Sequence, residues 1–241
     1  MPVRSVRLAI FVAGLAAFAA PAAARADDLS DFNAAVEQAA AHNRVAIGYL
    51  RTGNVDLAGL EIDRLRQAWQ QVTSRKKPDV FDRPLYVKTM TDIAMRLITA
   101  DMLLGSGRPD NARASLTAVR DDLYDLRTSA GVAVLADCVR DAGTAMDALM
   151  NYNERDIDFG RREQVSDLAG KAQAYGRTLA RCDGMADAGT RESPEFRRLI
   201  DGAQASLALI PKAIETQDKG LVHRVLIELR SFDNLLAFRF G

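Results

Sequence analysis

The sequence predicts an all-α protein of eight helices, paired into four antiparallel hairpins. Apolar residues recur at the three- and four-residue spacing that places them on one face of a helix, and no run of alternating β-branched residues predicts a strand. This apolar stripe occurs four times, with starts 54, 56 and 54 residues apart. Such a period is too long for one helix and suits a helical hairpin. Two tandem four-helix bundles and one stacked helical array both fit the pattern.

The four stripes share a 4-3-4-3 spacing and start at Ala58, Ala112, Leu168 and Val222. In the last stripe Asp233 takes a position that is apolar in the other three. We expect one of two arrangements: the neighbouring Phe232 rotates into the core in its place, or an arginine pairs with the carboxylate.

The first 26 residues have the pattern of a secretory signal peptide. Arg4 and Arg7 precede an apolar run over 8–20, and 24–26 is an Ala-Arg-Ala cleavage pattern. The apolar run is short for a membrane span, and no later stretch has the roughly 20 apolar residues that a span needs. An uncleaved anchor is the competing interpretation. We expect a periplasmic or secreted protein that begins near Asp27.

The charge balance excludes a basic nucleic-acid or anionic-lipid surface. The full chain has 32 basic and 32 acidic residues, and removal of three arginines with residues 1–26 leaves a net charge of −3. The helical-hairpin domain spans 27–241, either as one unit or as halves over 27–128 and 131–241. Four hairpins fill this length, which leaves little room for a separate catalytic domain.

The first hairpin pairs a helix over 29–50 with a helix that runs to about residue 74. Between them lies the turn 52–54, in which glycine can supply a positive φ. An Arg-Lys-Lys-Pro sequence then breaks the helical pattern, and a linker extends to Pro84, which suits a first helical turn.

The second hairpin begins with a helix that follows Pro84 and ends at 105–107, a Gly-Ser-Gly sequence. Pro109 opens its second helix. The connection 128–131 is so short that the fourth and fifth helices must be spatial neighbours.

The third and fourth hairpins follow the same plan. A polar segment over 151–163 separates the fifth helix from the sixth, which ends at 182–184. Ser193 is then an N-cap with proline and glutamate in the first turn. The last two helices turn near 217–220.

Cys138 and Cys182 are the two cysteines, and we expect them to form a disulfide. Each lies on the apolar stripe of its helix, and Gly160 is midway between them, so folding the hairpin back brings them level. The bond would close a loop of about 45 residues and contribute roughly 4 kcal/mol. Two buried free thiols are the alternative.

Arg66, Arg120 and Arg230 each follow the third position of a stripe, and Gly176 takes that position in the remaining repeat. With Asp233 they are the candidate binding residues. Guanidinium groups along a groove would bind a carboxylate or phosphate. Alternatively, each arginine covers the edge of the core and pairs with a neighbouring acid.

Metal, haem and enzyme sites lack the residues that they need. There are only two histidines, His42 and His223, and no Cys-x-x-Cys-His or Gly-x-Ser-x-Gly sequence. A zinc site would need more ligands at close spacing. We therefore expect no metal, no cofactor and no enzymatic activity.

The last hairpin, from 193–195 through Gly220 to Phe240, resembles the C-terminal hairpin of the cytochrome c-prime and soluble b-type cytochrome four-helix bundles. Those families are periplasmic haem proteins with a ligating histidine near the end of the last helix. Here 235–240 has no histidine, and 29–50 lacks the methionine that the b-type bundles use. The resemblance implies a bundle without haem.

Residues 49–58 and 103–112 resemble the middle of tetratricopeptide-type hairpins, although the period here is near 55 and theirs is 34. Those arrays bind peptides or proteins on a concave face. Together these observations predict an exported, non-enzymatic binding or scaffold protein that holds a partner protein or small ligand between hairpins. The alternative is a periplasmic haem- or metal-binding redox or stress protein on the same scaffold.

Overall fold

The computed structural model describes residues 20–153 and 157–241, with side chains from residue 28 onward. Within these ranges the chain is helical and contains no strand, so the all-α class is confirmed. The predicted signal peptide lies mostly outside the described residues; 20–26 form the start of the first helix. None of the described helices combines the length and apolar character needed to cross a membrane.

The helices are α1 Ala20–Arg51, α2 Val55–Thr73, α3 Arg83–Gly105, α4 Pro109–Ser129, α5 Leu135–Met150, α6 Arg162–Met185, α7 Ala188–Glu192, α8 Pro194–Leu207, α9 Ile210–Glu215 and α10 Lys219–Phe240.

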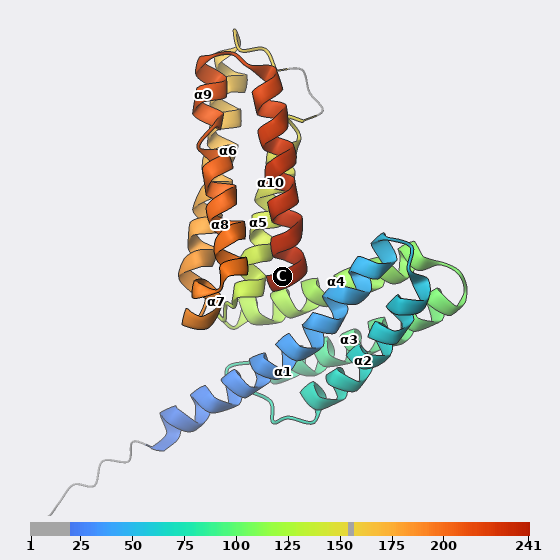
Figure 1. Ribbon diagram of the computed structural model, residues 1–241. Helices are drawn as coiled ribbons and strands as arrows, with labels where there is room; N and C mark the ends of the chain where they lie inside the picture. The colour runs from blue at the N-terminus through green and yellow to red at the C-terminus, as the bar shows by residue number, and fades with distance from the viewer. Residues whose placement is uncertain (1–19, 154–156) are drawn as a thin grey trace, which may run out of the picture.

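The helices form two groups, each around its own hydrophobic core (Figure 1). In the first group α1 packs on α2 and α4, and α3 packs on α2 and α4. In the second group α10 packs on α5, α8 and α9, and α6 packs on α5, α8 and α9. The two cores divide the chain between Leu126 and Cys138. We call these the first and the second helical group.

Every position of the four apolar stripes is buried, on α2, α4, α6 and α10. The stripe spacing therefore identified the face that each of these helices turns to its core. Burying an apolar side chain contributes about 1.5–3 kcal/mol, which makes these faces a principal stabilising force in both groups. The stripe includes Asp233, which is only 4% exposed.

The segment expected to form a seventh helix from Ser193 is divided into α8 and α9, and the short α7 precedes it. The predicted cap at Ser193 is present, because its hydroxyl accepts a hydrogen bond from the backbone N–H of Phe196. The interruption between α8 and α9 lies next to Pro211, in the first turn of α9. Proline has no N–H to donate to the carbonyl four residues earlier, at Leu207, so a continuous helix is disfavoured there.

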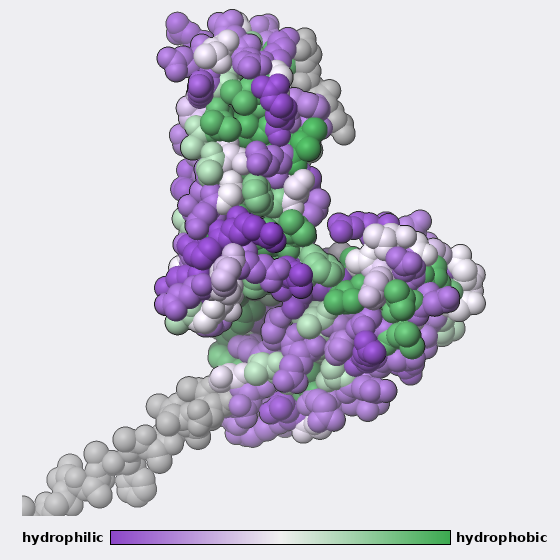
Figure 2. Space-filling view, in the orientation of Figure 1, coloured by the Kyte–Doolittle hydropathy of each residue, from purple (hydrophilic) through white to green (hydrophobic). Residues whose placement is uncertain are grey.

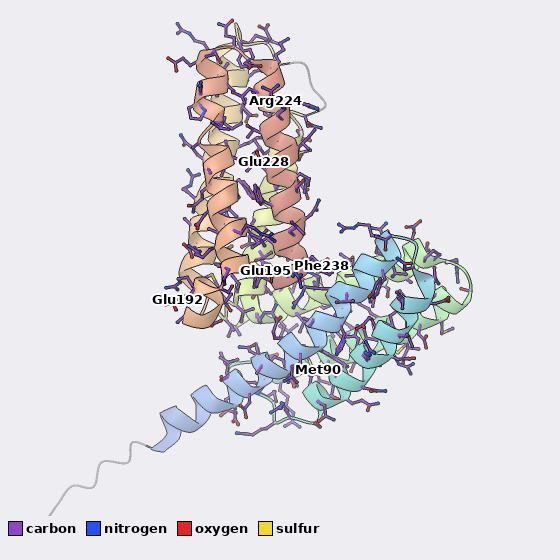
Figure 3. All side chains as sticks on the ribbon, in the orientation of Figure 1. Met90, Glu192, Glu195, Arg224, Glu228 and Phe238 are labelled. Atoms are coloured by element: carbon purple, nitrogen blue, oxygen red, sulfur yellow. A yellow bond between two sulfur atoms is a disulfide. The ribbon has the colours of Figure 1, made fainter. Side chains whose placement is uncertain are left out.

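Two sets of contacts join the groups. At the α4–α5 connection, Arg127 and Asp137 form a buried, bidentate ion pair, and Gly131 adopts a positive φ of 67°. At the end of α10, Phe238 reaches α1: a Cβ added to Gly48 would lie 3.1 Å from its ring (Figure 3). The glycine thus allows the close approach of α1 and α10.

The two cysteines lie opposite each other on α5 and α6, with a Cα–Cα distance of 5.4 Å and the sulfurs at disulfide distance. The predicted pairing is thereby confirmed as a disulfide-distance pair. Both side chains are buried in the core of the second group. The cross-link lies wholly within that group.

Candidate functional site

Three of the four candidate binding residues line one hollow. Arg120 of α4 meets Arg230 and Asp233 of α10 in a hollow of about 310 Å³, with α5 as its third wall. We call it the junction hollow. A second hollow of about 290 Å³ lies between α1, α4, α5 and the end of α10. It is called the lower hollow, and Arg120 lines both.

Both hollows lie where the two helical groups meet. The space-filling view shows a recess with apolar walls between the lower end of the second group and α1 (Figure 2). Apolar side chains of the lower hollow include Val36, Leu123 and Leu135. The recess depends on packing between helices that are far apart in the sequence.

Asp233 is a buried carboxylate paired with arginine, which is the second of the two expected arrangements. Its Oδ2 lies 3.4 Å from Nη1 of Arg230, and Nη2 of that arginine lies 2.6 Å from Oδ1 of Asp147. Phe232 is only half-buried beside it. The pKa of Asp233 is raised to about 6, because burial, helped by the charge of nearby Asp147, raises it by more than Arg230 lowers it.

Tyr175 of α6 lies in the core of the second group, near Asp233. Its hydroxyl is buried and has no partner at ordinary hydrogen-bond geometry among the described residues. It nevertheless lies close enough to Asp233 for the two groups to influence each other. Burial first, and then the Asp233 charge, raise the pKa of Tyr175, so the phenol stays protonated.

Arg120 differs from the other arginines around the two hollows. Arg44 pairs with Glu37 at 2.6 Å and donates to the Gly241 carbonyl at 2.9 Å. Arg140 pairs with Asp121 at 2.9 Å. Within the described residues Arg120 has neither an ion pair nor a hydrogen bond, although Asp121 and Asp233 are near enough to influence its pKa.

The electrostatic surroundings of Arg120 are unfavourable for its charge. Burial first, then the positive charge of Arg44, lower the pKa of Arg120. Its reference pKa is so high that the guanidinium stays charged at neutral pH. Arg120 is half-buried, so its charge is partly desolvated, and an anion in the hollow would offset that cost.

Arg66 does not join this site. It lies on α2, 43% exposed, and pairs with Asp101 at 3.1 Å and with Asp63 at 3.7 Å. It therefore matches the alternative of an arginine at the core edge paired with an acid. The same position in the stripe thus has different surroundings in different repeats.

The histidines and cysteines lie away from the hollows. Nδ1 of His42 is 2.7 Å from Oε2 of Glu61, across the α1–α2 pair, and His223 is exposed on α10. No group of three or more His, Cys, Asp and Glu side chains in the described part of the chain could hold a metal ion. Sequence reasoning did not single out Arg140, which lines both hollows, nor Arg44 and Tyr175, which lie beside them. Of these only Tyr175 had a signal, as a hydroxyl within an apolar stripe.

The chain matches no protein-family model, no curated protein and no solved structure. The geometry of the site is that of a half-buried cation without a partner among the described residues, between two hollows with partly apolar walls. Such an arrangement recognises the negative charge of a ligand and covers its apolar part.

Proposed function

We propose that this chain is an exported, non-enzymatic binding protein that holds a small carboxylate or phosphate ligand where its two helical groups meet. The observation that carries the proposal is Arg120, half-buried and without an ion pair or hydrogen bond among the described residues. An incoming anion would give the guanidinium the charge-assisted hydrogen bonds that it lacks.

The size of the hollows favours a small ligand. Volumes of about 290 and 310 Å³ lie at the lower end of the range of about 300–1,000 Å³ for small-molecule sites. The other arginines that line the hollows pair with acids, so Arg120 is the guanidinium left for an incoming anion to pair with. A ligand with one acidic group and a short apolar part fits this description.

For the scaffold, we propose two tandem four-helix bundles built from antiparallel hairpins, with halves near 27–128 and 131–241. The separate cores and the packing of consecutive long helices support this arrangement. A junction between two bundles is a frequent location for a ligand site.

The test compares two arginines at the same stripe position. Binding of acetate, succinate and inorganic phosphate is measured by isothermal titration calorimetry on Arg120→Gln and on Arg66→Gln as matched control. We expect at least one of these anions to bind the parent, because the bond to a charged group contributes about 1.5–3 kcal/mol. The affinity of the protein for that anion should fall roughly 10- to 100-fold in Arg120→Gln and stay unchanged in Arg66→Gln.

Equal losses in the two variants, or binding that survives in Arg120→Gln, would contradict the proposal. The ligand is then identified by mass spectrometry of what co-purifies with the protein from the native periplasm. An absorption spectrum and a metal analysis of the same preparation test the alternative function. A Soret band or a stoichiometric metal would favour the haem or metal protein.

A further inference from the structure

A larger groove lies in the second helical group, away from the junction. It has a volume of about 710 Å³ and runs between α6 on one side and α8 and α9 on the other. Its α6 wall extends from Arg162 to Gly176, which is roughly 20 Å of helix at 1.5 Å per residue. The groove is therefore long as well as open, and its volume suits a small molecule.

Two local features create this groove. The interruption between α8 and α9 ends one helix at Leu207 and begins the next at Ile210. The facing surface of α6 is made of small residues, Ala169, Ala172 and Gly176. A Cβ added to Gly176 would already contact the Leu207 side chain at 3.5 Å, so larger residues on this face would fill the space.

The walls are apolar, apart from a few uncharged polar side chains and one charge. The apolar members include Phe159, Val165, Leu207, Ile210, Pro211 and Ile214. Among the described residues that line the groove, only Arg162 is charged, at the first position of α6. It forms no ion pair or hydrogen bond in the described part of the chain, so its guanidinium is available to an anionic group at the end of the groove.

From this combination we infer that the groove binds a single-chain amphipathic carboxylate, of the fatty-acid type. The alkyl chain lies along α6 between the small residues and the α8–α9 interruption, and the carboxylate pairs with Arg162. Charge complementarity selects this occupant: one cation at one end of a long apolar groove matches one anion at one end of an apolar chain. The site is separate from the proposed anion site at the junction.

The experiment measures binding by calorimetry, with every probe below the concentration at which it forms micelles. Dodecanoate is compared with decanoate, and with dodecyltrimethylammonium, which has the same chain and the opposite charge. We expect dodecanoate to bind roughly 15-fold more tightly than decanoate, since each buried methylene changes Kd about fourfold. The cation should bind at least tenfold more weakly than dodecanoate.

Four variants locate the site. Arg162→Gln should remove the preference for the carboxylate, whereas Arg177→Gln, an exposed arginine of α6 outside the groove, should keep it. Ala169→Trp should weaken the binding of dodecanoate and of dodecyltrimethylammonium, because the indole fills the groove. Circular dichroism checks that this variant stays folded. Arg120→Gln should bind dodecanoate as the parent does, which separates this inference from the function proposed above.

Equal affinity for the two headgroups, or unchanged binding in Ala169→Trp, would overturn the inference. So would binding to phosphatidylcholine vesicles without binding to soluble dodecanoate, because that result indicates a membrane surface as the partner instead of a single chain.

Discussion

Asp233 is a buried carboxylate in a position where the other three repeats have an apolar side chain. Charged groups face it from three helices, Arg230 on its own helix, Asp147 on α5 and Arg120 on α4, and the uncharged Tyr175 hydroxyl faces it from α6. Burial outweighs the arginines and raises the pKa of Asp233 to about 6, whereas an exposed aspartate titrates near 3.9. Asp233 is therefore a source of pH-dependent stability.

The sign follows from proton binding. Between about pH 4 and pH 6 the folded protein holds a proton on Asp233 that the unfolded chain has lost, so stability falls as the pH rises through this range. We expect Asp233→Asn to be more stable than the parent at pH 7.5 by about 2–3 kcal/mol, at 1.36 kcal/mol per pKa unit, and equal to it near pH 4. Urea unfolding over this pH range provides the measurement.

Asp101→Asn, which removes an exposed partner of Arg66, is the control and should show no comparable pH dependence. If Asp233→Asn is instead less stable than the parent by a constant amount at every pH, the pair with Arg230 stabilises the fold and burial is not the dominant effect.

At the scale of single residues, sequence reasoning identified Arg120, Arg230 and Asp233 because they interrupt or flank regular stripes. It could not separate Arg120 from Arg66, since both occupy the same position in their repeats. The difference arises from what packs next to each helix. Arg66 on α2 is exposed, whereas the end of the second helical group covers Arg120.

The contact between α4 and α5 depends on the ion pair of Arg127 and Asp137, whose side chains are 6% and 8% exposed. The Asp137 carboxylate also accepts a hydrogen bond from the Val134 N–H at 3.2 Å, so it ties the start of α5 to the end of α4. Each charge is stabilised by the other, because neither side chain is exposed to water.

We expect Arg127→Met and Asp137→Asn each to lower the free energy of unfolding by about 3–5 kcal/mol, since each leaves a buried partner unsatisfied. The double variant should recover a large part of that loss. A double-mutant cycle in urea measures the coupling. The exposed pair Lys88–Asp92 is the control, with an expected contribution of about 0.3–0.5 kcal/mol. Additive losses in the buried pair would show that the two residues act independently.

At the scale of helices, the stripe spacing predicted which face of α2, α4, α6 and α10 is buried. The division of the expected seventh helix into α8 and α9 was missed, as was the short α7 before it. The signal was present in Pro211, but helical periodicity continues on both sides of it, which favoured one uninterrupted helix. The groove against α6 depends on that interruption.

The whole molecule has two cores and a single tryptophan, Trp69, which lies in the first core. The cysteine pair lies in the second. Tryptophan fluorescence therefore follows unfolding of the first group, and the cross-link constrains only the second. Recurrence of the stripes predicted the hairpin-sized unit, but the location of the boundary between cores depends on tertiary packing.

We expect Cys138→Ser with Cys182→Ser to lower the stability of the second group by roughly 4 kcal/mol, from the entropy of a loop of about 45 residues. Far-UV circular dichroism should then show an earlier transition, while the midpoint of Trp69 fluorescence stays within experimental error of the parent. A control sample of the parent with reducing agent should behave like the double variant. If both signals shift together, the two groups unfold as one cooperative unit.

The approach of Phe238 to Gly48 has a consequence for how this molecule can evolve. With a hydrogen at position 48, the aromatic ring fits against the backbone of α1; any larger side chain would act as a wedge between α1 and α10. One methyl group there would lie 3.1 Å from the ring, so the Phe238 ring or α1 would have to shift by a few tenths of an ångström. Because α1 and the end of α10 line the lower hollow, such a shift would change the shape of that hollow through a residue that does not line it.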